Sequence, residues 1–218
     1  YDTTRKAAHV SSLLQREPIA NVKLVEPAPV SLDELSLSLD NTYFSALKTG
    51  LPRDLAASNG IGWDETLLKS VLYSSGGVVR AVESALGMNT NSGSLSSGLH
   101  HARFKEGGGF CTVNGLVLGA KAAFKSGARR VLCLDLDAHA GGGTASYIEH
   151  GFDGVFEQLD VSLIHFDTYT DIKGATLIMS SSSTYIADIE RALSDITAPS
   201  SIDLVLYNAG MDPHERAG

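Results

Sequence analysis

The stretch Arg129-Arg-Val-Leu-Cys-Leu-Asp-Leu-Asp-Ala-His139 decides how the rest of the chain is interpreted. Its apolar residues run without the alternation of a half-exposed strand, so we predict a strand over residues 129–137 that is buried on both faces. Residues two apart in a strand share a face, so if the extended backbone continues to His139, Asp135, Asp137 and His139 project together at the carboxyl end. In an open parallel sheet, ligands bind beyond those ends.

Predicted strands and helices alternate along the second half of the chain. The patterns predict helices over 113–125, 144–150 and 184–193, and further strands over 160–166 and 201–208. This alternation is typical of an α/β fold in which helices flank a parallel sheet.

The first half of the chain gives weaker patterns. Residues 20–26 predict a short strand, and Ser31-Leu-Asp-Glu34 matches a capping box, which predicts that a helix starts there. Apolar residues recur at helical spacing from Asp64 to Leu86, interrupted by Gly76-Gly77. Two glycines cost a helix about 2 kcal/mol relative to alanine. Either another segment approaches closely at this point, or the pattern contains two helices.

Composition limits the classes of function. The 218 residues suit one domain, and 43% hydrophobic with 19% charged residues exclude a disordered chain. The net charge of −8 disfavours nucleic acid as a direct partner and suits a cationic substrate. The sequence shows no signal peptide and no apolar run of membrane-spanning length, so we expect an intracellular, cytoplasmic protein without membrane contact. The chain starts at Tyr1 rather than Met and ends within a motif at Gly218, so we also expect a fragment.

Acidic side chains beside a histidine indicate a metal at the end of the 129–137 strand. Burying ionised Asp135 and Asp137 next to an imidazole costs several kcal/mol unless a cation compensates. The alternative is a solvated strand edge with a core histidine. A third acid, Asp212, ends the motif Tyr207-Asn-Ala-Gly-Met-Asp, which follows another predicted strand. Asp137, His139 and Asp212 together offer the nitrogen and oxygen ligands that, with an open position, are typical of a catalytic metal site.

Adjacent histidines form a second candidate feature. His100 and His101 lie in Gly98-Leu-His-His-Ala102, shortly before Gly107-Gly-Gly-Phe-Cys111, whose glycines let the backbone approach a ligand closely. Most adjacent histidines are surface features. A general acid–base pair with Asp135 as the supporting carboxylate also fits this arrangement.

Taken together, these motifs resemble the histone deacetylase family. Four motifs occur in the order and at the spacing that the family shows: Gly98-Leu-His-His-Ala102, Gly108-Gly-Phe-Cys111, Leu134-Asp-Leu-Asp-Ala-His139 and Tyr207-Asn-Ala-Gly-Met-Asp212. The residues of the Asp-Leu-Asp-Ala-His and Tyr-Asn-Ala-Gly motifs are most similar to those of class IV members and their bacterial relatives. The resemblance runs from about Gly76 to Gly218 and more faintly from Arg5. It implies the arginase/deacetylase fold, a three-layer α/β fold with a parallel sheet flanked by helices. Residues 1–218 would form a single catalytic domain, incomplete at both ends.

The resemblance also implies a role for each matching residue. The implied ligands of one zinc ion per chain are Asp137, His139 and Asp212. The implied catalytic residues are His100, His101 and Asp135, and Asp135 would also contribute to a structural monovalent-cation site for K⁺. The implied lining of the channel for an acyl-lysine side chain is Gly109 and Phe110.

The chain departs from the family pattern in several places. Gly142 stands where the family usually has Asp or Asn, so we predict that His101 lacks its polar partner. Ala140 replaces a residue that is commonly polar. The family's oxyanion-stabilising tyrosine comes later than the last residue here, and losing one oxyanion donor typically costs about 10²–10³ in rate. For the acids Asp167 and Asp171, we favour the interpretation as parts of a solvated loop over a cation-binding role.

The function implied is zinc-dependent amide hydrolysis that removes acetyl or other acyl groups from lysine side chains or related amines. The substrate would be acetylated lysine or an acetylated polyamine, and the oligomeric state is open. One alternative is a catalytically impaired relative that binds acylated ligands or partner proteins. A second is a ureohydrolase with two manganese ions, which Gly141 disfavours because it replaces a bridging carboxylate.

Overall fold

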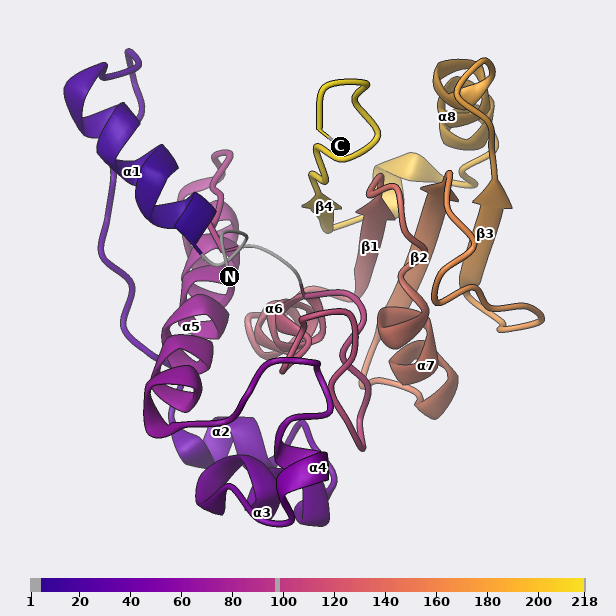
Figure 1. The fold of residues 1–218 in the computed structure, drawn as a ribbon. Helices are drawn as coiled ribbons and strands as arrows, with labels where there is room; N and C mark the ends of the chain where they lie inside the picture. Colours follow the sequence, from indigo (N-terminus) through magenta and orange to yellow (C-terminus); the bar gives the residue numbers. More distant parts are fainter. Residues whose placement is uncertain (1–4, 97–98, 218) are drawn as a thin grey trace.

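A computed structural model describes residues 5–96 and 99–217 of the chain (Figure 1). Gly98 of the histidine motif and both ends of the chain lie outside these residues. The helices are α1 Lys6–Arg16, α2 Leu32–Ser36, α3 Asn41–Thr49, α4 Arg53–Ala56, α5 Glu65–Met88, α6 Gly115–Lys125, α7 Gly142–His150 and α8 Tyr185–Ser194, with the short 3₁₀ helix η2 Pro199–Ser201. The strands are β1 Arg130–Asp135, β2 Val155–Ser162, β3 Ala175–Met179 and β4 Leu204–Asn208. Within the described residues, no helix is both long and apolar enough to cross a membrane.

The strands form one four-stranded sheet with the order β3-β2-β1-β4, and all neighbouring strands are parallel. The predicted parallel α/β sheet is therefore confirmed. In this register, Asp135 at the end of β1 lies opposite Asp160 of β2 and Asn208 of β4. Polar side chains from three neighbouring strands thus meet at the carboxyl edge of the sheet.

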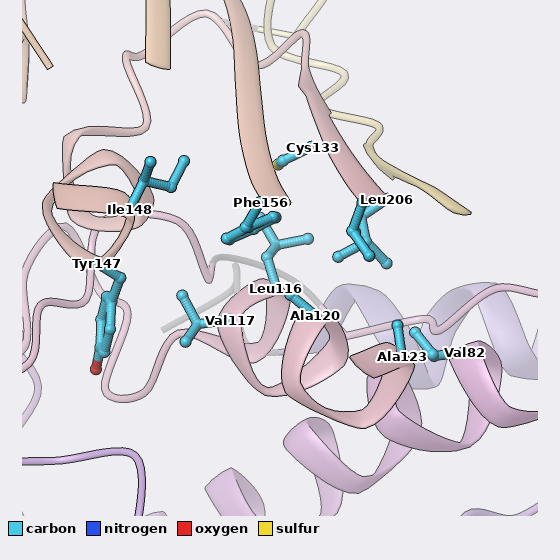
Figure 2. Packing of buried hydrophobic residues seen from close by; sticks show 11 residues of the cluster. Val82, Leu116, Val117, Ala120, Ala123, Cys133, Tyr147, Ile148, Phe156 and Leu206 are labelled. Carbon is cyan, nitrogen blue, oxygen red and sulfur yellow. The ribbon is translucent and has the colours of Figure 1, made fainter. Parts of the chain in front are cut away.

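Helices cover both faces of the sheet. On one face, α6 and α7 pack against β1, β2 and β4 through a buried cluster (Figure 2): Val82, Leu116, Val117, Ala120, Ala123, Val131, Cys133, Tyr147, Ile148, Phe156 and Leu206. On the other face, Ala192 of α8 packs with Leu132, Leu159 and Val161. Each large apolar side chain buried in this way contributes about 1.5–3 kcal/mol. The result is a three-layer arrangement of helices, sheet and helix.

Helix α5 runs unbroken through Gly76-Gly77. A Cβ atom at Gly76 would lie 2.1 Å from the carbonyl oxygen of Ala28, so glycine lets the segment before α2 cross the helix. The backbone N–H of Val30 donates to the carbonyl of Leu72 at 3.0 Å next to this crossing. Of the alternatives given by the sequence, the close approach is correct.

Local sequence patterns misplaced some elements. The strand expected over 20–26 is absent: its residues lie exposed, begin in a turn and pair with no strand. The strand expected over 160–166 is β2, which spans Val155–Ser162 instead. The predicted helix start at Ser31 is confirmed, because its hydroxyl and the Glu34 side chain form the reciprocal bonds of a capping box.

Candidate active site

The metal-ligand candidates meet where β1 and β4 end. Asp137 and His139 follow β1, and Asp212 follows β4. Nδ1 of His139 lies 3.1 Å from Oδ1 of Asp137 and 3.0 Å from Oδ2 of Asp212. One ligand atom from each residue lies within 4.8 Å of the other two. One imidazole nitrogen and two carboxylate oxygens at this spacing are a donor set that fits zinc.

The backbone turns out of β1 rather than extending to His139 as the sequence predicts. The strand ends at Asp135, whose Oδ1 accepts a hydrogen bond from the N–H of Asp137 at 3.2 Å. A Cβ atom at Gly210 would lie 2.6 Å from Oδ2 of Asp137, so glycine lets the segment after β4 approach. Asp212 then accepts from the N–H of Ala138 at 3.0 Å. The ligand set therefore comes together through a turn and a close approach, not through strand alternation.

Asp137 is poised to act as an anion. Burial favours the neutral carboxyl group, but the charge of His100 and the hydrogen bonds from His139 outweigh this effect and hold the pKa of Asp137 below its usual value. About a third of each side chain of His139 and Asp212 is exposed, so the ligand set opens onto a surface groove.

His100 is held by the end of β1. Its Nδ1 lies 2.7 Å from Oδ2 of Asp135, and both side chains are buried, at 4% and 0% exposed. Asn208 donates from Nδ2 to the other oxygen of Asp135 at 2.8 Å. Burial opposes the charge on the imidazole, but the Asp135 carboxylate outweighs it and raises the pKa of His100 to about 9. The geometry therefore brings together His100 and Asp135 as the sequence predicts.

His101 has a carboxylate partner, which corrects the prediction made from Gly142. Its Nδ1 lies 3.0 Å from Oδ2 of Asp167, in the segment after β2. Asp167 also accepts from the backbone N–H of Gly143 at 3.0 Å, and Arg103 pairs with its other oxygen. Only 10% of the Asp167 side chain is exposed, so the interpretation of this residue as part of a solvated loop is wrong.

Gly109 and Phe110 lie beside the histidines. A Cβ atom at Gly109 would lie 2.2 Å from Cδ2 of His101, so only glycine allows this contact. Phe110 is 54% exposed, and Phe166 meets the ring of His101 edge-on with centroids 4.9 Å apart. Both phenylalanines line the same groove as the histidines and the metal-ligand candidates. That Gly109 and Phe110 line a substrate channel remains a prediction.

Asp160 is a buried acid that the sequence analysis missed. It is fully buried and accepts from the N–H of Gly141 at 2.7 Å and from Ser162. Burial, followed by the neighbouring charge of Asp135, raises the pKa of Asp160 to about 7. The signal available in the sequence was an acid within an apolar strand, but the register that puts it beside Asp135 is visible only in the sheet.

Comparisons with known proteins agree with this geometry. The family model for the histone deacetylase domain matches residues 2–173. The chain belongs to the histone deacetylase family. It is 30% identical over 130 residues to the acetoin utilization protein AcuC of Bacillus subtilis, covering 55% of this chain and 34% of AcuC. The chain spans about half or less of the length of the curated relatives it matches.

Solved structures share the fold. The HD domain of HDA15 superposes with a TM-score of 0.79 at 17% identity, covering 97% of this chain and 66% of that one. An acetylpolyamine aminohydrolase from Burkholderia pseudomallei gives a TM-score of 0.78 at 15% identity, covering 98% and 75%. These likenesses confirm the three-layer deacetylase fold that the motifs implied.

Proposed function

We propose that this chain carries a zinc-dependent amide hydrolase site that removes acetyl groups from lysine side chains or from acetylated polyamines. The observation that supports it is a ligand set of Asp137, His139 and Asp212 beside two histidines that each contact a carboxylate. The histone deacetylase family match and the AcuC and acetylpolyamine aminohydrolase likenesses favour this chemistry over the ureohydrolase alternative.

Zinc held by these ligands would supply a Lewis acid that polarises the acyl carbonyl and lowers the pKa of water towards ~7. His101 accepts a proton from the attacking water, whose oxygen bonds to the carbonyl carbon. The carbon–nitrogen bond then breaks, and His101 returns the proton to the leaving nitrogen. The first products are a carboxylic acid and a free amine. The proton of the acid then passes to the amine, which gives a carboxylate and an ammonium group, so atoms and charges balance.

The remaining site residues hold this arrangement together. Asp135 orients His100, whose Nε2 lies 3.7 Å from Oδ1 of Asp137. Phe110 and Gly109 form an apolar wall along which the methylene chain of a lysine or polyamine can lie. The net charge of −8 draws a cationic substrate towards the groove, as steering rather than as recognition.

We propose two further features. A structural monovalent cation such as K⁺ binds next to Asp135, where the adjacent buried carboxylates of Asp135 and Asp160 favour a positive charge. Residues 1–218 form a single catalytic domain. This is supported by α6, which contributes Leu116 and Val117 to the cluster on the sheet and Leu118 to another buried cluster, with Leu35 of α2 and Tyr43 of α3.

The impaired-relative alternative is supported less well than the hydrolase. It rested on a missing partner for His101 and on the absence of the family's oxyanion-stabilising tyrosine from residues 1–218, and the contact of Asp167 with His101 argues against the first of these. The experiment that decides between these functions is deacetylation by the full chain as its gene encodes it. We expect release of acetate from an acetyl-lysine peptide or from N-acetylputrescine that a chelator abolishes, zinc restores and Asp137→Ala lacks. A zinc-loaded, folded protein that hydrolyses neither substrate would favour the binding role.

A further inference from the structure

The carboxylate of Asp167 joins segments that are far apart in the chain. Its Oδ2 lies 3.0 Å from Nδ1 of His101 and accepts from the N–H of Gly143, at the start of α7. Its Oδ1 pairs with Nη2 of Arg103, whose Nη1 also donates to the carbonyl of Gly142 at 3.2 Å. One acid therefore contacts the histidine motif, the Arg103 side chain and the first turn of a helix.

Gly142 leaves the space that Asp167 fills. A Cβ atom at Gly142 would lie 2.2 Å from the backbone oxygen of Asp167 and 2.5 Å from its Oδ1. Such contacts do not occur between real atoms, so any side chain at 142 must displace Asp167. Asp167 can therefore take its position only because residue 142 is a glycine.

The backbone around Asp167 turns its side chain inward. Asp167 has a φ of 58°, in the left-handed region that Asp tolerates better than most residues. The preceding residue, Phe166, is fixed by two contacts. Its carbonyl accepts from the N–H of Ala140 at 3.2 Å, and the Phe166 ring packs edge-on against His101. The acid is therefore presented by a turn that contacts the site.

A carboxylate only accepts hydrogen bonds, so its bond to Nδ1 requires that this nitrogen carry the proton. The ring nitrogen left with a lone pair is then Nε2. We propose that Asp167 is the positioning residue that fixes His101 as its Nδ1–H tautomer, and that Gly142 is required because Asp167 occupies its side-chain space. The catalytic consequence, a correctly aimed base, rests on the proposed function, but the tautomer does not.

The test is long-range ¹H–¹⁵N NMR of the full, zinc-loaded chain with labelled histidine, with a metal-free sample beside it. The principal variants are Asp167→Ala and Gly142→Ala, which remove or displace the carboxylate. Asp167→Asn is the conservative variant, because its amide oxygen can still accept from Nδ1. The matched control is Asp171→Ala, which removes an exposed acid of the same segment that also has a left-handed backbone, with a φ of 59°.

We expect the Nδ1–H signature of His101 in the parent, Asp167→Asn and Asp171→Ala, and its loss in Asp167→Ala and Gly142→Ala. If Asp167→Ala does not fold, Asp167→Ser makes the same comparison, since its hydroxyl is too short to reach His101. Where the parent deacetylates, Asp167→Ala should lower kcat by about 10²-fold or more with little change in KM. A folded Asp167→Ala protein that keeps the Nδ1–H tautomer would overturn the proposal, whether or not any protein in the series shows activity.

Discussion

The two histidines of the site are supported from two different regions of the molecule. His100 depends on the end of β1, where Asp135 is fully buried between β2 and β4. His101 depends on the segment after β2, where Asp167 is held by a partly exposed arginine and a helix N-terminus. The first support is part of the sheet, whereas the second is brought in by a turn. Loss of the support from the sheet is therefore expected to cost more stability than loss of the support from the turn.

The largest expected effect is on the sheet side. Asp135→Ala leaves His100 buried without its carboxylate, and breaking a buried pair by removing one partner costs about 3–5 kcal/mol. We expect this loss of unfolding free energy in urea denaturation. Asp167→Ala should lose less, about 1.5–3 kcal/mol, the range for hydrogen bonds to charged groups. Equal losses for the two variants would remove the distinction between the two regions.

A second prediction concerns the close approach that builds the ligand set. Gly210→Ala places a methyl group 2.6 Å from Oδ2 of Asp137 and must push the segments after β1 and β4 apart. We expect zinc affinity to fall by about 10–100-fold, as for other changes that misorient ligands. The control is Gly87→Ala in α5, where a Cβ atom meets nothing within 4 Å. This control should bind zinc normally and gain about 0.5–1 kcal/mol in stability. Unchanged zinc affinity in Gly210→Ala would mean that the close approach of the segments after β1 and β4 does not determine the geometry of the zinc ligands.

A third prediction uses the pH dependence of stability on the sheet side. The pKa of Asp160 is raised to about 7 in the folded protein, so the native state binds its proton more tightly than the unfolded state. Its contribution to stability is full below about pH 4 and is lost as the pH rises through 7. Asp160→Asn should therefore be more stable, relative to the parent, at pH 8 than at pH 5, measured by urea midpoints in a K⁺-free buffer with a chelator present, so that no bound cation offsets the charge of Asp160.

Asp153→Asn serves as the control for this measurement, because Asp153 is exposed. Its stability relative to the parent should not change between the two pH values. A constant difference between Asp160→Asn and the parent across this range would contradict the role given to burial.

The smallest effect is expected at Arg103. Its side chain is 37% exposed, and ion pairs of exposed groups contribute about 0–1 kcal/mol. Arg103→Gln should therefore lower the unfolding free energy by less than about 1 kcal/mol in the same urea assay. If Arg103→Gln lost as much unfolding free energy as Asp135→Ala, the contacts of Asp167 would contribute as much to stability as those of the sheet.

The same contrast explains what the sequence could predict. β1 and its acids were found because a fully buried parallel strand has an unbroken apolar pattern, and the acids follow it directly. Asp212 and the histidine pair were found as candidates from their own motifs, and the resemblance to the family then implied their roles. Asp167 was wrongly assigned to a solvated loop because its role depends on the space left by Gly142, which no local pattern reports. Asp160 was missed because strand register is a tertiary property, and the strand over 20–26 was wrong because it has no neighbour to pair with.

The most direct test of the central claim is the zinc stoichiometry of the folded chain, measured by titration on the parent and on Asp137→Ala, with circular dichroism to show that both fold. The account predicts about one zinc per chain in the parent, and no binding by Asp137→Ala at the same concentrations. A folded parent that binds no zinc, or an Asp137→Ala variant that binds it equally well, would contradict the assignment of Asp137, His139 and Asp212 as the metal site.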